Sequence, residues 1–277
     1  MWRIWRRARL LAALAAFFLL VGVIGAPQLC LLLFRTRPAV APAATRRKAV
    51  GRWQSWWGVL AYHFCTALGG MRVTMNCPPP TLLAREKGDF IVIANHFGLF
   101  DGIFLVMVLA AAGRRDVRIV AKREVIRVPV LGRVWREMGS AFVARDRRAA
   151  DGDAVEQLAA VAREDGACVL IFPEGTVYKG VPPGKGFRHL LPPRPGGFRR
   201  LVRALPGRRV LCVTFRWHDF RISGPLAEAA VTPPGHDVTV GWRLLDAPSP
   251  EEADQFLVSL WRHLDAELDQ AGGHRLV

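Results

Sequence analysis

From about residue 70 onward, short apolar runs alternate with longer segments whose apolar residues repeat at helical spacing. Apolar runs of roughly four to eight residues, bounded by turn-forming residues, predict buried strands. The predicted strands are 72–76, 90–94, 117–121, 140–144, 167–172, 209–216 and 237–244. The predicted helices are 101–113, 129–138, 150–165, 196–205 and 250–270. This alternation predicts an α/β fold in which a mixed, mostly parallel sheet is flanked by helices.

The last predicted helix has a clear start signal. Ser249 can cap it, Pro250 would occupy its first position, and the acidic residues that follow suit the positive end of a helix. Its apolar residues repeat at helical spacing and predict a stripe that faces the core. Before it, residues 180–197 are rich in proline and glycine and predict a long loop, of the kind that is often functional.

The N-terminus carries an uninterrupted apolar segment, residues 10–34, without a charged side chain. It exceeds the roughly 20 residues that a helix needs to cross the hydrocarbon core of a bilayer. A cleaved signal peptide is the alternative, but the segment lacks a good small-residue cleavage site, so we expect a retained anchor. Arginines flank both ends and give no clear orientation. Pro27 can kink the helix, or let it enter one leaflet and return.

A second N-terminal segment, residues 46–70, begins with basic residues and continues with several aromatic side chains, Trp53, Trp56 and Trp57 among them. Tryptophan favours the headgroup level of a membrane, and cations there favour anionic lipid. The segment therefore predicts a helix lying at the membrane interface. A Trp-rich helix packed on the rest of the protein is the alternative, and both can hold on different faces.

Charge narrows the class of partner. The chain has 39 Lys and Arg against 23 Asp and Glu residues, a net charge of +16, which indicates an anionic partner. Nucleic acid, an anionic membrane surface and a phosphorylated substrate all fit, but the apolar N-terminus favours lipid, and we expect no nucleic acid. The five cysteines form no CxxC pair and the histidines show no metal-binding spacing. We therefore expect no disulfide, no metal, and a domain that faces the cytosol.

Two strand ends carry candidate chemistry. The strand that ends at Ala94 leads directly to His96 and Asp101, in "NHFGLFDG". A carboxylate on one imidazole nitrogen fixes the tautomer and leaves the other nitrogen free to take a proton. A helix-capping aspartate beside a loop histidine is the alternative. A second buried strand runs into the turn "FPEGT", with Glu174, Gly175 and Thr176, and a pair of such motifs is more specific than either alone.

These motifs resemble, in order and spacing over residues 70–220, those of the 1-acylglycerol-3-phosphate and lysophospholipid acyltransferase family. "NHFGLFD" resembles its histidine–four residues–aspartate block, and "AKREVIRVPVLG" its second block, which contains Lys122. "GSAFVARDR" resembles the block whose arginine binds substrate phosphate, here Arg145, and "FPEGT" the third block. "FRHLLPPRPGGFRRLVRAL" is similar to the membrane-anchored, lysocardiolipin-type branch, with Arg194 at a basic position. Val177 departs from the family, which often has arginine there.

The resemblance implies a glycerol-phosphate acyltransferase-like fold over residues 71–277, the catalytic domain, behind an N-terminal anchor and interfacial helix pair at 1–70. It implies His96 as general base, oriented by Asp101. Further along, Lys122, Arg145, Glu174, Gly175, Thr176 and Arg194 would bind substrate. The sequence cannot name the donors that stabilise the oxyanion, but backbone N–H groups near Gly98 are candidates.

The implied reaction moves a fatty acyl group from acyl-CoA, or from acyl carrier protein, to the free hydroxyl of 1-acylglycerol-3-phosphate. The donor is a substrate, and no cofactor is expected. Another lysophospholipid acceptor, lysophosphatidylglycerol or lysophosphatidylethanolamine, is the first alternative. A non-enzymatic lipid-binding scaffold is the second. The expected location is a bacterial inner membrane, with the catalytic domain on its cytoplasmic face; the sequence does not indicate an oligomeric state.

Overall fold

The computed structural model describes residues 2–144, 148–178, 186–218 and 236–271. Their centre is a sheet in the order β1-β7-β6-β2-β5-β3-β4, in which only β6 and β7 pair antiparallel. The strands are β1 Arg72–Met75, β2 Ile91–Ala94, β3 Val117–Lys122, β4 Ala141–Val143, β5 Cys168–Ile171, β6 Val210–Trp217 and β7 Asp237–Leu245. The seven predicted strands and the mixed, mostly parallel sheet are confirmed, with ends shifted by at most two residues.

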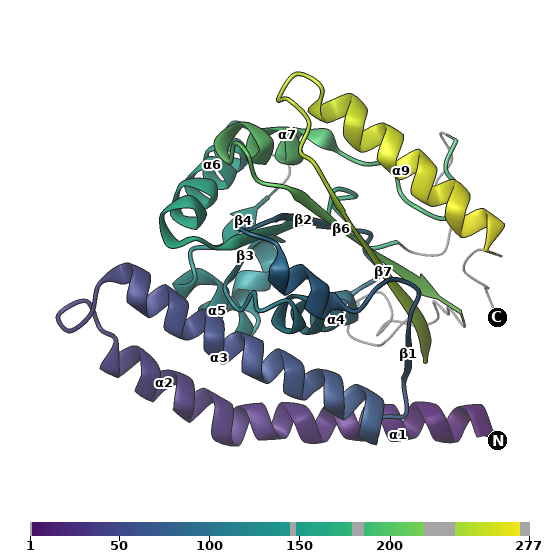
Figure 1. Cartoon of the computed structure of the whole chain (residues 1–277). Coiled ribbons are helices and arrows are strands. Elements are labelled where there is room, and N and C mark those ends of the chain that lie inside the picture. Colours follow the sequence, from purple (N-terminus) through teal and green to yellow (C-terminus); the bar gives the residue numbers. More distant parts are fainter. Residues whose placement is uncertain (1, 145–147, 179–185, 219–235, 272–277) are drawn as a thin grey trace.

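Helices cover both faces of the sheet (Figure 1). Those of the main domain are α4 Leu99–Ala111, α5 Leu131–Glu137, α6 Arg148–Asp165, α7 Pro195–Ala204 and α9 Ala253–Gln270, with short 3-10 turns η3 Pro80–Arg85 and η4 Arg123–Arg127. Helices α6, α7 and α9 pack on one face and α4 on the other, so each face has its own buried apolar cluster. This matches the prediction of a flanked α/β sheet.

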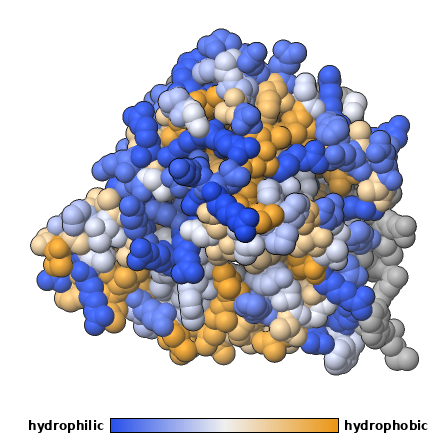
Figure 2. All heavy atoms as spheres, viewed as in Figure 1, coloured by the Kyte–Doolittle hydropathy of each residue, from blue (hydrophilic) through white to orange (hydrophobic). Residues whose placement is uncertain are grey.

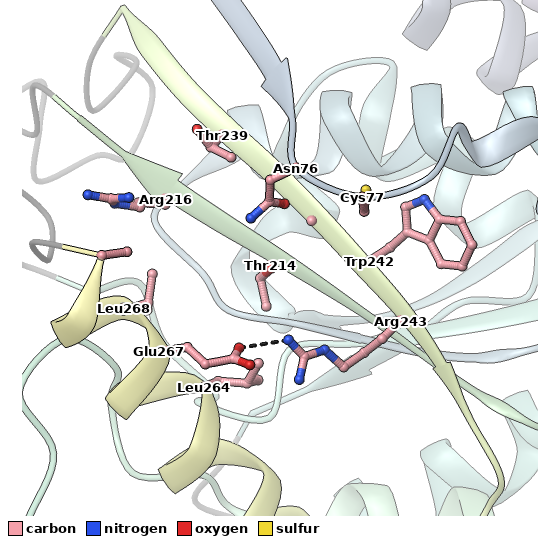
Figure 3. A pocket seen from close by; sticks show the side chains of 12 residues that line it. Asn76, Cys77, Thr214, Arg216, Thr239, Trp242, Arg243, Leu264, Glu267 and Leu268 are labelled. Atoms are coloured by element: carbon pink, nitrogen blue, oxygen red, sulfur yellow. Dashed lines mark hydrogen bonds and ion pairs between the residues drawn. The ribbon is translucent and has the colours of Figure 1, made fainter.

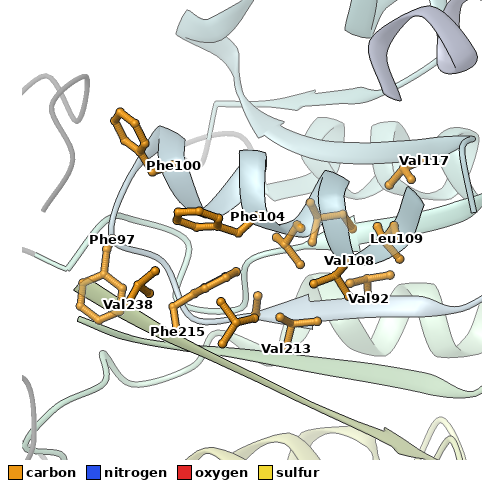
Figure 4. Close-up of a cluster of buried hydrophobic side chains, with 14 of the residues drawn as sticks. Val92, Phe97, Phe100, Phe104, Val108, Leu109, Val117, Val213, Phe215 and Val238 are labelled. Atoms are coloured by element: carbon orange, nitrogen blue, oxygen red, sulfur yellow. The ribbon is translucent and has the colours of Figure 1, made fainter. Parts of the chain in front are cut away.

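The cluster beneath α4 holds the start of that helix in place. Phe100 and Phe104 of α4 are almost fully buried, and the Phe104 ring packs against the ring of Phe215 in β6 (Figure 4). The central strands β2 and β5 are buried at every position, as expected for parallel strands covered on both faces. The loop between β2 and α4 is therefore anchored at both of its ends.

The prediction for the start of the last helix is wrong by three residues. Helix α9 begins at Ala253, and Ser249 lies in the preceding turn, where its hydroxyl donates to Glu252 at 2.8 Å. The Glu252 backbone N–H donates to the Ser249 carbonyl at 3.1 Å. The Glu252 N–H also donates to the Ser249 hydroxyl at 3.3 Å, and the Ser249 N–H to Glu252 Oε2 at 3.4 Å, so Ser249 does cap the turn that leads into the helix.

The N-terminal segments form a helical hairpin that lies along the main domain (Figure 1). Helix α1, Trp2–Leu20, continues through a π-helical turn, Val21–Gly25, into α2, Ala26–Arg35, and the axis bends there. The returning helix α3, Ala43–His63, ends in a second π-turn, Phe64–Leu68. The bend lies just before Pro27, the residue at which a kink was predicted. The stretch Ile4–Arg35 is long and apolar enough to cross a membrane, judged by length and composition.

The Trp-rich helix α3 has one buried and one exposed face. This is compatible with both predictions for the segment, a helix packed on the protein and a helix at a membrane interface. Trp57 is buried, whereas Trp56 is 58% exposed. Gly58 of α3 lies close against α4, since a Cβ added there would lie 2.4 Å from Val106. The exposed apolar side chains gather on this hairpin: twelve of the fourteen large ones among the described residues lie between Ile4 and Leu68. Figure 2 shows apolar surface along the edge formed by α1.

Candidate active site

The two motif strands lie side by side, so the loops that follow them meet at one edge of the sheet. Strand β2 pairs with β5 in parallel, with Ile93 opposite Ile171. His96 follows β2, and Glu174 follows β5. Open α/β sheets place ligand sites at the carboxyl ends of their strands, so this edge is the expected location for a site.

His96 and Asp101 are brought together as predicted. His96 Nδ1 lies 3.0 Å from Asp101 Oδ2. Asp101 is the third residue of α4, and the same oxygen accepts the backbone N–H groups of Phe97 and of Gly98, the latter at 2.9 Å. Asp101 is fully buried, and its other oxygen, Oδ1, has no partner among the described residues. The capping and orienting interpretations of Asp101 are therefore both correct, because one carboxylate caps the helix and holds the imidazole.

This arrangement removes two of the candidate oxyanion donors near Gly98. The Phe97 and Gly98 N–H groups beside the turn donate to Asp101, so they are not free to bind a developing negative charge. Their role is to fix the carboxylate that orients His96.

The surroundings of His96 leave one nitrogen open. The imidazole stacks on Phe172, with ring centroids 4.0 Å apart, and its side chain is 22% exposed. With Nδ1 on Asp101, Nε2 makes no hydrogen bond to any described residue. The preceding residue, Asn95, is buried and exchanges two hydrogen bonds of 2.8 Å with the backbone of Phe215. Asn95 thereby ties the end of β2 to β6, and Phe172 limits the rotation of the imidazole. Roles for Asn95 and Phe172 were not predicted from the sequence, although both residues lie within the two motifs.

The "FPEGT" turn lies next to this pair. Gly175 has φ +68, a conformation that favours glycine, and its N–H donates to the Phe172 carbonyl at 3.0 Å. The Arg194 N–H donates to the Pro173 carbonyl at 2.8 Å, and a Cβ added at Gly175 would lie 3.3 Å from Arg194 Cδ. The exposed side chain of Arg194 has no hydrogen bond or ion pair to a described residue. The structure thus brings Glu174, Gly175 and Arg194 together, with Thr176 half-buried beside them.

Glu174, beside Gly175 and Arg194, is only 2% exposed. Burial raises its pKa well above the usual value, and the nearby Asp101 charge acts in the same direction. The backbone N–H groups of Leu191 and His96 and the indole of Trp261 oppose this shift of the pKa. Of these, the Leu191 N–H donates to Glu174 Oε2 at 3.3 Å, while Oε1 has no geometric hydrogen-bond partner among the described residues. Burial outweighs the donors, so the neutral form of the carboxyl is favoured.

One predicted substrate-binding residue, Lys122, lies apart from this group. Lys122 ends β3, pairs with Glu124 at 3.0 Å and is half exposed. Strand β5 separates it from β2, so it lies two strands from His96, roughly 10 Å across the sheet. Arg145, the predicted phosphate ligand, lies outside the described residues, as does part of the predicted loop 180–197.

A separate cavity of about 140 Å³ lies between α9 and the strands β6 and β7 (Figure 3). It is lined by polar residues, including Thr214 and Thr239, and by the ion pair of Arg243 with Glu267 at 2.7 Å. None of the predicted site residues lines it. Over the ranges that the structure describes, no three His, Cys, Asp or Glu side chains cluster as metal ligands. The strand-end group therefore remains the candidate site.

Fold and site together define an α/β protein with a carboxylate-oriented histidine at the carboxyl edge of its sheet. The acyltransferase family model matches residues 78–216, half of the chain. The chain is 31% identical over 146 residues to a 1-acyl-sn-glycerol-3-phosphate acyltransferase of Haemophilus influenzae, covering 52% of this chain and 55% of the relative. It is 35% identical over 128 residues to the enzyme of that name from Limnanthes douglasii, covering 44% of each.

The whole fold is similar to the crystal structure of the 1-acyl-sn-glycerophosphate (LPA) acyltransferase PlsC from Thermotoga maritima. The TM-score is 0.62 at 20% identity, and the match covers 95% of this chain and 98% of that one. The chain belongs to the acyltransferase family, within which its relatives are 1-acylglycerol-3-phosphate acyltransferases. It spans about half the length of the curated relatives it matches.

Proposed function

We propose that this protein transfers a fatty acyl group from a thioester donor, acyl-CoA or acyl carrier protein, to the free hydroxyl of 1-acylglycerol-3-phosphate. The observation that carries the proposal is the His96–Asp101 pair, with Nδ1 held at 3.0 Å and Nε2 open beside the Glu174 turn. Two relatives in the same family bear the name of this activity.

The proposed reaction needs a base, because an alcohol is a weak nucleophile at neutral pH. His96 Nε2 takes the hydroxyl proton while the oxygen attacks the thioester carbonyl. Asp101 holds the tautomer and stabilises the imidazolium that forms. Collapse of the tetrahedral intermediate forms the ester and breaks the C–S bond, and the imidazolium returns its proton to the departing thiolate. No covalent acyl-enzyme is needed, since the chain has no GxSxG motif.

Acceptor binding is assigned to the Glu174 turn and to Arg194. A guanidinium suits a phosphate monoester because its N–H groups form paired, charge-assisted bonds. Arg194 lies over Gly175 with its side chain unpaired among the described residues, next to Glu174. Val177 stands where the family often has arginine, and Arg194 compensates for that loss in this proposal. Arg145 and Lys122 remain further proposed ligands.

We also propose that the hairpin attaches the protein to a bilayer, lying in one leaflet's interface instead of spanning it. Near the start of α1, Arg6 pairs with Asp237 at 3.0 Å. Near the start of α3, Arg46 pairs with Glu137 at 2.6 Å. Both ends of the hairpin therefore contact the main domain, whereas a spanning helix would place its ends on opposite sides of the bilayer. The proposed site is a bacterial inner membrane, with the domain on the cytoplasmic face.

The direct test supplies purified protein with acyl-CoA and lysophosphatidate and measures the release of free CoA. We expect His96→Ala to lower kcat by about 100-fold or more, with circular dichroism unchanged, because the general base is lost. A panel with lysophosphatidylglycerol and lysophosphatidylethanolamine tests the other acceptors. Equal acylation by His96→Ala and the wild type would refute the mechanism. A wild type that binds lipid but releases no CoA with any acceptor would favour the scaffold.

A further inference from the structure

Four consecutive backbone N–H groups, those of residues 188–191, all donate to carboxyl oxygens. Arg188 donates to Asp265 Oδ2 at 2.9 Å, and His189 and Leu190 donate to Asp265 Oδ1 at 2.7 and 2.8 Å. The fourth N–H, of Leu191, donates to Glu174 Oε2 at 3.3 Å. One short segment of loop therefore joins a carboxylate of α9 to the buried carboxyl beside His96.

Asp265 reaches the site from outside the region that identifies the family. It lies in α9, well beyond residue 216 where the family match ends, yet it is 6% exposed. One turn earlier, Trp261 is fully buried, and its indole lowers the pKa of Glu174. Residues one turn apart share a helix face, so α9 presents both groups toward the loop and the Glu174 turn.

The same loop also fixes the proposed phosphate ligand. Three residues after Leu191, the Arg194 N–H donates to Pro173 at 2.8 Å, and the side chain lies over Gly175. The segment is thus held at its start by Asp265 and at its end by the "FPEGT" turn. A shift at its start would be transmitted to both Glu174 and Arg194.

We propose that Asp265 is a positioning residue of the acceptor site: by holding residues 188–190 it sets the positions of Glu174 and Arg194. The proposal rests on the proposed function in one respect, because Glu174 and Arg194 are assigned there to the acceptor. A purely stabilising role for Asp265 is the competing explanation. The two differ in what a substitution does to acceptor KM and to the backbone around Glu174.

The chain offers a matched control on the same helix. Asp269, one turn after Asp265, is 44% exposed and pairs with the Arg188 side chain at 2.7 Å and the His189 ring at 3.1 Å. It contacts the same loop residues, but through their side chains. Asp265→Asn keeps shape and one accepting oxygen while removing one acceptor of a backbone N–H. Asp269→Asn makes the same chemical change without touching the backbone. Asp265→Glu, measured alongside, keeps the charge but displaces it.

Two readouts are taken, hydrogen exchange followed by mass spectrometry and steady-state kinetics with lysophosphatidate. We expect Asp265→Asn to speed exchange in peptides covering 186–194 and 172–178, and to raise acceptor KM by about fivefold, as for a lost charge-assisted hydrogen bond. Its kcat should stay within about twofold, because His96 and Asp101 are untouched. Asp265→Glu should act in the same direction, and Asp269→Asn should change neither readout.

Faster exchange confined to 186–190 with an unchanged KM would overturn the proposal, as would equal effects from Asp269→Asn. A fall in kcat at constant KM would indicate loss of folded protein and count against it. If the wild type does not acylate lysophosphatidate, the proposed function fails separately. Exchange in 172–178 then still decides whether Asp265 controls the Glu174 turn.

Discussion

At the residue scale, Glu174 is the carboxyl whose surroundings most oppose its charge. Burial raises its pKa well above 4.5, the ordinary value. An acid with a raised folded-state pKa binds a proton in the folded chain that the unfolded chain has already released. The stability of the fold therefore decreases as pH rises from about 4.5 until the folded pKa is passed.

This predicts a pH signature for Glu174→Gln, which keeps the shape of the neutral acid but cannot ionise. The difference in free energy of unfolding between variant and wild type should grow in favour of the variant as pH rises above about 4.5, by up to about 1.4 kcal/mol per pH unit, and should level off once the folded pKa of Glu174 is passed. Urea unfolding at several pH values measures it. Glu251→Gln, at an exposed position ahead of α9, is the control and should show no such trend. A gap that stays constant with pH would contradict the prediction.

The contact between His96 and Asp101 could be predicted from the sequence because one short stretch, from the end of β2 to the first turn of α4, holds both residues. A spacing of five residues, with a strand before it and a helix after it, is enough to bring His96 to Asp101. Partners from distant segments could not be predicted in this way. Leu190 and Asp265 are 75 positions apart, and only the packing of α9 makes them neighbours. Sequence likewise does not show that two of the candidate oxyanion donors, the N–H groups of Phe97 and Gly98, already donate to Asp101.

At the element scale, an ion-pair network holds α3 against the sheet. Arg47 of α3 pairs through two nitrogens with Asp165 at the end of α6, and Asp165 also pairs with fully buried Arg118 of β3 at 2.6 Å. Burial of Asp165 acts to raise its pKa, but the Arg47 and Arg118 guanidiniums outweigh it and the pKa is lowered. The stability that this carboxylate contributes is present above about pH 4 and is lost as pH falls through its folded pKa.

We expect Asp165→Asn to lower the free energy of unfolding at pH 7 by about 1–3 kcal/mol, because it removes the charge that Arg47 and fully buried Arg118 share, while Arg118 keeps its ion pair with Asp116. Denaturant unfolding measures this loss. The neighbouring Glu164→Gln is the matched control, since Glu164 is 70% exposed and lies 3.4 Å from Arg47; its cost should stay below about 1 kcal/mol. The difference in free energy of unfolding between Asp165→Asn and wild type should become smaller below pH 4. Equal costs for the two substitutions would show that burial of the network is unimportant.

The strands of this fold were predictable, whereas the packing of the N-terminal helices was not. Strands β2 and β5 are buried on both faces, and a continuous apolar run in the sequence predicts such a strand. The hairpin depends on contacts between distant segments, such as Gly58 of α3 against Val106 of α4. The start of α9 was misplaced because Ser249 and Glu252 bond to each other in a turn that resembles a helix start.

At the scale of the whole molecule, the net charge of +16 and the apolar face of the hairpin would act together in the proposed attachment to a bilayer. On α1, Ile4, Leu11 and Phe18 are exposed and recur every seven residues, so they share a face, while Leu10 and Leu14 are buried against the domain. The same helix thus joins the core on one side and offers an apolar stripe on the other. Attachment should therefore require no unfolding of the hairpin.

The last prediction concerns this stripe. We expect Phe18→Glu combined with Trp56→Glu to weaken partitioning onto vesicles of anionic and zwitterionic lipid by at least tenfold, since burying one such side chain contributes roughly 1.5–3 kcal/mol. Vesicle flotation measures the bound fraction. The control is Ala266→Glu, which adds one negative charge at an exposed position of α9, on the opposite side of the molecule from α1 (Figure 1), and it is compared with Phe18→Glu alone as well as with the double variant.

Activity toward a short-chain, monomeric lysophosphatidate should survive in the double variant, because the stripe is separate from His96. Activity toward vesicle-bound acceptor should fall in proportion to the loss of binding. If the double variant floats with vesicles as well as Ala266→Glu does, the hairpin face is not the membrane contact. In that case flotation should be repeated at higher salt, which weakens any electrostatic contribution to vesicle binding. Attraction between a basic protein and anionic lipid is screened over a Debye length of about 8–10 Å near physiological ionic strength.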